Sequence, residues 1–477
     1  MNNDTNLKDE IQTLCAGFNT HFIERDEEIL GAVLAILSNE NILYLGPPGT
    51  AKTYLAQSIC RSIRGADFFY YLLTRFTTPE EIFGPLSIKS LENDEFRRKT
   101  DGCLPASHIG FLDEIFKANS SILNSLLTIL NERRFHNGTE VIDTPLLTVF
   151  GASNELPEED ESLEALYDRF LFRYDVRYIQ NEENVKTLLF RSDPTFSPLT
   201  TLTTEKIAWI REQSRSVQIP GEVQDIILSL KRHLEKRDSE EGDGFWVSDR
   251  RWKKITGVLR VAAAANGNGS VDRTMLLLLQ HLLWDLPEQK EEIRNLIIDH
   301  LVTGGTDTEQ LEAGILHLQQ MLTKGDAFVE DVSLPVPVFA HDSDGNNQKI
   351  VSYADLVAAS KDEKWFYFTV ELSFSTGYPF AQVMDILQKE YQFSPKKSPN
   401  PDRKAVCEAE YVYLMGQFQR YLTIVREGAV LLKQNLEANI WLTRSDIDEV
   451  ISVQQNRLAR VHLFEEKMDT LTHAIRS

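Results

Sequence analysis

The run Asn41-Ile-Leu-Tyr-Leu45, followed at once by Gly46-Pro-Pro-Gly-Thr-Ala-Lys52-Thr53, decides the fold of this 477-residue chain. The first run is short and apolar, which predicts a buried strand. The second is a turn rich in glycine and proline, and it opens a helix at about Lys52. In a strand–loop–helix unit, the backbone N–H groups at the helix N-terminus form a binding site for phosphate. The alternative is a surface turn with an incidental lysine.

Three further apolar runs predict strands at Phe68–Leu73, His108–Leu112 and Leu146–Ala152, with helical patterns between them. Residues 6–38 are also predicted helical, with a break near 21–25. Strands that alternate with helices form right-handed βαβ units and a parallel sheet. The sequence therefore predicts an α/β fold of the phosphate-loop NTPase type.

Two stretches interrupt this alternation, and each predicts an inserted hairpin. The first is Ile82–Leu104, which contains Gly84-Pro85 and a polar bend. The second is Arg133–Ile142, where Asn137-Gly138 stands between alternating residues. That dipeptide favours a type I′ turn.

Within the phosphate loop, Lys52 is expected to reach the β- and γ-phosphate oxygens, and the Thr53 hydroxyl to bind Mg²⁺. The residue before the lysine is usually glycine, but here it is Ala51. Alanine can adopt right-handed helical backbone angles, so we expect the loop to keep its shape.

Two carboxylates, Asp113 and Glu114, follow the apolar run that begins at Ile109. Ligands of open α/β sheets bind at the carboxyl ends of the strands. We expect Asp113 to hold Mg²⁺ through its water shell and Glu114 to polarise the attacking water. The alternative is that both residues only favour the first turn of a helix.

Three more polar residues are candidates for the same chemistry. Asn154 ends the fourth predicted strand, where an amide can position water beside a γ-phosphate. Arg169 and Arg250 are cations suited to phosphoryl charge, and Arg250 starts a helix where it opposes the helix dipole. The neighbouring Arg251 is an equal candidate for that second role. The alternatives are an asparagine in a turn and solvated arginines.

Beyond the first 195 residues the strand pattern fades, and four segments are expected. Residues 1–195 form the nucleotide-binding αβα part, and residues 200–303 an all-helical lid. Residues 306–327 and 403–477 form a discontinuous three-helix bundle, and residues 328–400 a β-rich insertion.

The composition sets limits on the class of protein. There are 50 Lys and Arg against 72 Asp and Glu, a formal charge of −22, which disfavours sequence-independent DNA binding. The four cysteines are far apart, which disfavours a disulfide framework. No apolar run approaches the roughly 20 residues of a membrane span, and no secretory signal is recognisable. A cytoplasmic protein is expected.

Taken in order, these motifs resemble those of AAA+ ATPases, and the two insertions resemble those of the MoxR group within them. More narrowly, Tyr71–Ser87, Ala152–Pro157, Ser162–Arg169 and Val247–Lys254 are similar to the RavA (regulatory ATPase variant A) branch. In this resemblance Gly46–Thr53 is Walker A and Ile109–Glu114 is Walker B. Asn154 is then sensor 1, Arg169 the arginine finger and Arg250 sensor 2.

The resemblance implies an ATPase that binds ATP or ADP with Mg²⁺ in a homo-hexameric ring, with Arg169 acting on the nucleotide of a neighbour. It implies chaperone-like remodelling with a protein that carries a von Willebrand factor A (vWA) domain. It also implies that residues 328–400 bind a lysine decarboxylase or another client. The implied nucleotide contacts are Ile23 at the adenine, Gly49, Thr50, Ala51, Lys52, Thr53 and Tyr54.

Two other functions remain open at this point. One is a helicase-like, DNA-directed ring motor, which would use basic residues of the second hairpin such as Arg133, Arg134 and His136. Salt-dependent DNA binding would distinguish it. The other is a nucleotide-gated scaffold with little turnover.

Overall fold

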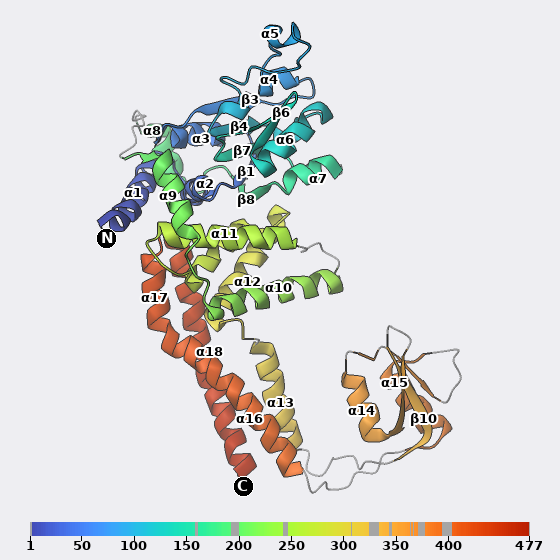
Figure 1. Cartoon of the computed structure of the whole chain (residues 1–477). Helices are drawn as coiled ribbons and strands as arrows, with labels where there is room; N and C mark the ends of the chain where they lie inside the picture. Colours follow the sequence, from blue (N-terminus) through green and yellow to red (C-terminus); the bar gives the residue numbers. More distant parts are fainter. Residues whose placement is uncertain are drawn as a thin grey trace. The chain divides into compact units, whose positions relative to one another are not determined.

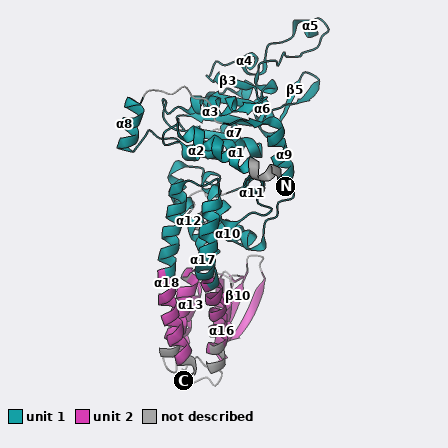
Figure 2. Cartoon of the chain, turned by 90° about the vertical axis from the view of Figure 1, so that its left-hand side faces the viewer, with its two compact units in different colours: residues 1–306, 423–458 teal, residues 307–422, 459–477 magenta. Residues whose placement is uncertain are grey.

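The structure is a computed structural model of the chain, which describes residues 2–157, 161–191, 200–241, 247–306, 308–323, 333–342, 346–362, 364–365, 367–370, 377–393 and 403–476. The chain divides into two compact units, residues 1–306 with 423–458 and residues 307–422 with 459–477 (Figure 2). The predicted borders near residues 195, 328 and 400 lie outside the described residues.

A parallel five-stranded sheet lies at the centre of the first unit, in the order β3-β4-β7-β1-β8 (Figure 1). Its strands are β1 (Asn41–Leu45), β3 (Phe68–Leu72), β4 (Ile109–Asp113), β7 (Thr148–Ser153) and β8 (Phe170–Asp175). The first four strands are those that the sequence predicts, and the parallel pairing confirms the α/β fold.

Strand β8 is absent from the sequence-based prediction. Its segment, Phe-Leu-Phe-Arg-Tyr-Asp, places a charged residue in the middle of an apolar run. Arg173 is nevertheless buried, because it pairs with Asp285, more than 100 positions later in the chain. A buried charge is tolerated when it is paired, and that pairing is not visible in the local pattern.

Helices cover this sheet, and the predicted break between the first two is confirmed. Helix α2 packs on β1 and β8, and α3 packs on β4. The helices of this part are α1 (Asn2–Asn19), α2 (Asp26–Ser38), α3 (Lys52–Arg61), α4 (Pro79–Phe83), α5 (Ile88–Leu91), η1 (Leu104–Ala106), η2 (Ile115–Lys117), α6 (Ser120–Glu132), α7 (Glu161–Tyr167) and α8 (Glu182–Phe190).

The second predicted hairpin is confirmed as β5 (Arg134–Asn137) and β6 (Glu140–Asp143), but its turn is not type I′. The turn is centred on Gly138 and Thr139, and of these two only Gly138 has a positive φ. The Asn137 side chain instead bonds to both the N–H and the C=O of Arg98. This contact ties the hairpin to the first insertion and holds Asn137 in the strand.

The first insertion is not a regular hairpin. In the described residues it contains the short helix α5 and a single antiparallel bridge, Leu86 with Arg98. The prediction of a hairpin over Ile82–Leu104 is therefore correct only at that bridge.

The helical lid follows the sheet and shares one hydrophobic core with it. Helices α9 and α11 pack on α2. The elements of the lid are β9 (Leu202–Thr203), which pairs with β2 (Ile63–Arg64), α9 (Thr204–Ser214), α10 (Gly221–Glu241), α11 (Asp249–Ala265), η3 (Arg273–His281), η4 (Pro287–Gln289) and α12 (Lys290–Thr303).

A later segment returns to this unit. It contains the π-helical turn η5 (Thr423–Glu427), α17 (Gly428–Ala438) and the start of α18 (Arg444–Arg476). The Trp441 indole donates to the Ala262 carbonyl at 2.9 Å, and buried Asp446 pairs with Arg294. These contacts explain why residues 423–458 group with the first unit. The predicted bundle segment, residues 403–477, is thereby divided between the two units.

The second unit has two parts. Helices α13 (Thr308–Thr323) and α16 (Arg403–Leu422) pack together, and α16 contacts the end of α18 through Tyr411 and Thr472. The insertion has its own core around an antiparallel sheet in the order β11-β10-β12. Its elements are β10 (Ser333–His341), β11 (Asn347–Ser352), α14 (Tyr353–Lys361), β12 (Tyr367–Val370) and α15 (Phe380–Glu390).

This arrangement confirms the predicted fold class: a parallel α/β core, a helical lid, and a helical region that carries a small β-rich insertion. None of the helices in the described part of the chain combines the length and the apolar character that a membrane span needs.

Candidate active site

The phosphate loop connects β1 to α3, as the sequence predicts. All five residues of β1 are buried, and the chain leaves the sheet at Gly46. Gly46 has a φ of 135°, and a Cβ there would lie 2.1 Å from the carbonyl oxygen of Val176. Gly49 has a φ of 81°, a conformation that favours glycine. Both glycines are therefore needed for the backbone of the loop to turn back over the end of the strand.

Ala51 does not adopt the right-handed helical conformation that the sequence analysis expects. Its φ and ψ are 64° and 20°, in the left-handed region, and it precedes the first residue of α3. An L-residue with a Cβ pays about 1–2 kcal/mol for this conformation. The loop keeps its shape, but it does so with backbone strain at the position where glycine is usual.

Lys52 is buried and its ammonium lies inside the loop. Nζ donates to the carbonyls of Gly46 and Pro47 at 2.7 and 2.8 Å, and it lies 3.4 Å from the Thr50 hydroxyl. Burial lowers the pKa of Lys52, and the nearby carboxylates of Asp113 and Glu114 oppose that shift. The ammonium is thus within electrostatic reach of both acids.

The acidic pair stands at the carboxyl end of β4, where the sequence analysis expects it. Burial raises the pKa of Asp113, and the charge of Lys52 partly opposes this. Glu114 has a φ of 53°, and its carboxylate accepts from Asn154 Nδ2 at 2.7 Å and lies 3.2 Å from Lys117 Nζ. The structure therefore brings together Lys52, Asp113, Glu114 and Asn154 from three neighbouring strand ends.

A magnesium ion fits this donor set. Mg²⁺ prefers oxygen ligands and keeps several waters, and it is held by one or two protein groups together with substrate phosphates. Thr53 is the second residue of α3, and Asp113 is the last residue of β4, the strand on which that helix packs. These two residues would hold the ion, which would neutralise phosphate charge.

A cavity of about 390 Å³ lies beside the loop and has the size of a nucleotide site. Five of the predicted nucleotide contacts line it, namely Ile23, Gly49, Thr50, Ala51 and Tyr54. The Tyr54 hydroxyl and His21 Nε2 are 3.1 Å apart and form one wall. Helix α8 contributes Val185 and Leu188 to the opposite wall. Apolar and aromatic walls next to a phosphate loop suit a nucleotide base.

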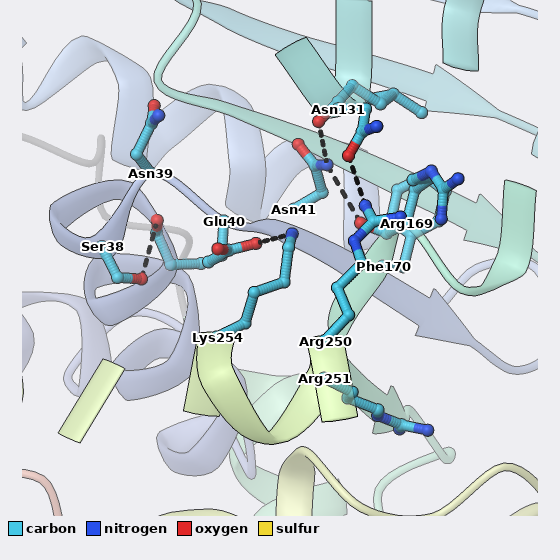
Figure 3. A network of polar contacts seen from close by, with 12 residues as sticks. Ser38, Asn39, Glu40, Asn41, Asn131, Arg169, Phe170, Arg250, Arg251 and Lys254 are labelled. Carbon is cyan, nitrogen blue, oxygen red and sulfur yellow. Dashed lines mark hydrogen bonds and ion pairs between the residues drawn. The ribbon is translucent and has the colours of Figure 1, made fainter. Parts of the chain in front are cut away.

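Arg169 lies at the other edge of the sheet. It precedes Phe170, which pairs with Asn41 at the start of β1, whereas the phosphate loop follows Leu45 at the end of β1. Four strand steps separate the two edges by about 13 Å. The Asn41 amide donates to the Arg169 carbonyl at 3.0 Å (Figure 3). The Arg169 guanidinium pairs with Asp168.

Arg250 lies beside Arg169 at this edge (Figure 3). Its guanidinium bonds to the side-chain oxygen of Asn131 in α6. Burial lowers the pKa of Arg169, and the charge of Arg250 lowers it further. Two neighbouring cations repel each other, and an anion bound between them would relieve that repulsion.

Arg251 has a different environment. It is buried, and its guanidinium lies 2.8 Å from Asp285 and donates to the Trp284 carbonyl. Arg173 pairs with the same Asp285, and burial lowers the pKa of Arg251 to about 10. Of the two adjacent arginines that the sequence leaves open, Arg250 is therefore the one available to a ligand.

Two residues near the loop are absent from the sequence-based set. Arg25 is buried, and its guanidinium donates to the Thr50 and Arg177 carbonyls. The Tyr178 hydroxyl donates to the Pro48 carbonyl at 3.2 Å. Arg25 lies in the predicted helix break, and Tyr178 follows the unpredicted strand β8, so no local pattern identified either one.

Two family profiles match this chain. Residues 9–196 match the MoxR domain of the MoxR-vWA-beta-propeller ternary systems. Residues 222–297 match the AAA lid domain. The two matches fall on the sheet-containing part and on the helical lid.

Two proteins of Methanocaldococcus jannaschii are similar to more than half of this chain. The uncharacterized protein MJ0812 is 45% identical over 57% of this chain and 70% of its own length. The uncharacterized protein MJ0079 is 45% identical over 56% of this chain and 68% of its own length. The structural protein ORF618 of Acidianus two-tailed virus is 26% identical, over 68% of this chain and 59% of its own length.

A crystal structure of a candidate ATPase from Cytophaga hutchinsonii has a similar fold. It matches with a TM-score of 0.50 and 17% identity, over 62% of this chain and 94% of its own length. At this identity the match supports the fold alone. The sheet order, the two profile matches and the two relatives with 45% identity agree, and the chain therefore belongs to the MoxR family of AAA ATPases, with an AAA domain followed by an AAA lid.

Proposed function

We propose that this protein hydrolyses ATP at sites shared between neighbouring subunits of a ring. One observation supports this most directly. Lys52, Asp113, Glu114 and Asn154 gather at one edge of the sheet, while Arg169 and Arg250 gather at the opposite edge. A single chain thus carries one half of a phosphoryl-transfer site at each edge.

At the first edge, the loop amides and Lys52 bind the β- and γ-phosphates. The phosphates take the place of the Gly46 and Pro47 carbonyls as partners of the ammonium. Glu114 accepts the proton of the attacking water, and the Asn154 amide holds its carboxylate in place. Thr53 and Asp113 hold Mg²⁺.

At the second edge, Arg169 and Arg250 act on the nucleotide of the neighbouring subunit. Arg169 is separated from its own phosphate loop by about the length of β1, roughly 13 Å, so it does not reach its own γ-phosphate without a large rearrangement. A guanidinium from a neighbour stabilises the charge that spreads over the phosphoryl oxygens in the transition state. The ring is proposed to be a hexamer, as the MoxR resemblance implies.

We further propose that hydrolysis drives remodelling of protein complexes together with a vWA-domain partner. The support is the matched family, whose description names MoxR, vWA and β-propeller proteins as one ternary system. The RavA-like assignment and the lysine decarboxylase as a client of residues 328–400 remain predictions, as does the cytoplasmic location.

A DNA-directed motor is less well supported. The guanidinium of Arg133 bonds to Asn39, Asn41 and Leu130 inside the protein, and Arg134 pairs with Asp143. The tip of this hairpin is Gly138 and Thr139, which carry no charge. DNA binding that weakens steeply with increasing salt concentration would nevertheless support a DNA-directed motor.

The direct experiment measures steady-state ATP hydrolysis and nucleotide binding in Glu114→Gln. The proposal predicts loss of turnover with nucleotide binding retained, because the amide keeps the shape of the side chain but not its basicity. Glu235→Gln on the exposed face of α10 is the control and keeps full activity. If wild-type protein binds nucleotide but shows no turnover that Glu114→Gln can abolish, the scaffold function is correct instead.

A further inference from the structure

Arg25 occupies a position that the proposed reaction does not yet use. It lies between the end of α1 and the start of α2, and the residue is 7% exposed. It lines the cavity beside the phosphate loop, and it also lines a separate cleft of about 970 Å³ formed by α1, α2 and α12. The side chain therefore forms part of the wall between the two.

The guanidinium of Arg25 bonds only to main-chain carbonyls among the described residues. Its Nη2 donates to Arg177 O at 2.7 Å, its Nε lies 3.4 Å from Thr50 O, and its Nη1 donates to Glu24 O. The planar fork of an arginine can hold several acceptors in fixed directions. Arg25 thus connects the middle of the phosphate loop to the end of β8.

Among the described residues Arg25 forms no ion pair, although Glu24 and Glu28 lie near enough for its charge to act on the pKa of each carboxyl group. The charge of Arg25 acts on ionisable groups on both sides of its side chain. It lowers the pKa of Lys52 on the phosphate side, although burial is the larger cause there. It also opposes the rise that burial produces in the pKa of Glu28, which reaches about 7.

A cation that is buried without a direct ion pair costs free energy, and a further anion nearby offsets part of that cost. The nucleotide phosphates would be such an anion. They would bind on the loop whose Thr50 carbonyl contacts Arg25, and Arg25 also lines the cavity next to them.

We propose that Arg25 is a positioning residue for the nucleotide. Its guanidinium holds the Thr50 carbonyl, which keeps the loop amides directed at the phosphates, and its charge attracts the phosphates from behind the loop. The inference rests on the proposed ATP site and adds a second cation to it.

The charge of Arg25 predicts how the binding affinity depends on the charge of the ligand. Attraction by Arg25 should grow with the number of phosphates, because the ligand charge grows with that number. A residue that only stabilised the fold would change the affinity for ATP, ADP and AMP by the same factor. The dependence on phosphate number therefore separates the two roles.

The test measures dissociation constants of ATP, ADP and AMP for wild type, Arg25→Met and Arg25→Lys, together with KM and kcat for ATP. For Arg25→Met we expect a loss of about tenfold or more for ATP, less for ADP and least for AMP. KM should rise more than kcat falls. Arg25→Lys keeps the charge but not the fork, so it should keep the dependence on phosphate number and recover part of the affinity.

Arg177→Met is the matched control. Its side chain is 70% exposed and pairs with Asp175 close to the same strand end, so its removal should leave all three dissociation constants unchanged. Equal losses for ATP, ADP and AMP in Arg25→Met, or no loss, would overturn the proposal. If Arg25→Met does not fold, Arg25→Gln, a polar side chain without charge, takes its place, and a loss equal for all three nucleotides in that variant contradicts the charge role. A wild type that binds no nucleotide would instead contradict the ATP site itself.

Discussion

The two edges of the five-stranded sheet carry opposite kinds of chemistry. At the carboxyl ends of β1, β4 and β7 a lysine, two carboxylates and an amide contact or polarise one another, and a cavity lies beside them. At the amino ends of β1 and β8 two arginines lie together, and one of them, Arg169, pairs with Asp168. The first edge can bind a triphosphate. The second edge can stabilise phosphoryl charge on a triphosphate that is bound elsewhere.

If the sites are shared as proposed, the isolated chain is incomplete at both edges for a geometric reason. The length of β1 separates the two sets, and the strand is a rigid, fully buried element in the middle of the sheet. Changes at one edge should therefore affect turnover, binding or stability independently of changes at the other. The following predictions test that independence.

The largest effect is expected for Arg169→Ala. Loss of a guanidinium that stabilises the transferred phosphoryl group should lower kcat by about 10³–10⁵-fold. Nucleotide binding should stay nearly unchanged, because the phosphate loop lies at the other edge. Measurement of kcat alongside the ATP dissociation constant checks this, and a variant that loses binding as well would break the separation of the two edges.

Next in size is the contrast between Arg250→Ala and Arg251→Ala. Arg250→Ala should lower kcat about 100-fold, the scale of a lost positioning contact, with little change in unfolding free energy. Arg251→Ala should cost about 2 kcal/mol of stability, because it removes the charged hydrogen bonds to Asp285 and to the Trp284 carbonyl. Activity assays and denaturant unfolding of both variants check the pair; the reverse pattern would assign the ligand role to Arg251.

A stability effect that depends on pH is expected at Glu28, which is 8% exposed in the cleft next to the phosphate-loop edge. Burial raises the pKa of Glu28 from 4.5 to about 7. Between these two pH values the folded protein keeps the Glu28 proton, whereas the unfolded chain has lost it. Glu28 therefore lowers the free energy of unfolding as pH rises from about 4.5 to 7, and this destabilisation is complete above that range.

Glu28→Gln should remove this penalty. At pH 8 the variant should be more stable than wild type by about 2–3 kcal/mol, and the gain should disappear near pH 4.5. Thermal unfolding of both proteins across this range measures the effect, with Glu291→Gln in the same cleft as a control without a gain. A gain that is independent of pH would point to packing instead of ionisation.

The smallest effect is expected for Ala51→Gly. Glycine removes the strain of the left-handed backbone, but it increases the entropy of the unfolded chain, so the net gain should be about 0.5 kcal/mol. A slightly higher Tm with unchanged kcat would support this description of the loop. A clear loss of stability would mean that Ala51 is not strained.

Contiguous motifs explain why most residues of the candidate site could be proposed from the sequence. Residues 46–53 and 109–114 carry both the turn and its chemistry within a few positions, so one window reveals them. The features that escaped depend on distant partners. Strand β8 requires Asp285 to neutralise Arg173, and Arg25 requires the Thr50 and Arg177 carbonyls.

Conformation and position were also harder to predict than residue identity. The left-handed φ of Ala51 and the shifted turn at Gly138 arise from contacts around the chain, such as those of Asn137 with Arg98. Likewise, the sequence indicates a basic helix start at Arg250 but not that α11 places it beside Arg169.

The most direct test of shared sites mixes two inactive variants, Lys52→Ala and Arg169→Ala. In a mixed ring, a Lys52→Ala subunit supplies its Arg169 to the intact phosphate loop of an Arg169→Ala neighbour. The account predicts that ATP hydrolysis reappears on mixing and is greatest at comparable amounts of the two. Absence of activity at every ratio, in mixtures that are shown to co-assemble, would contradict it.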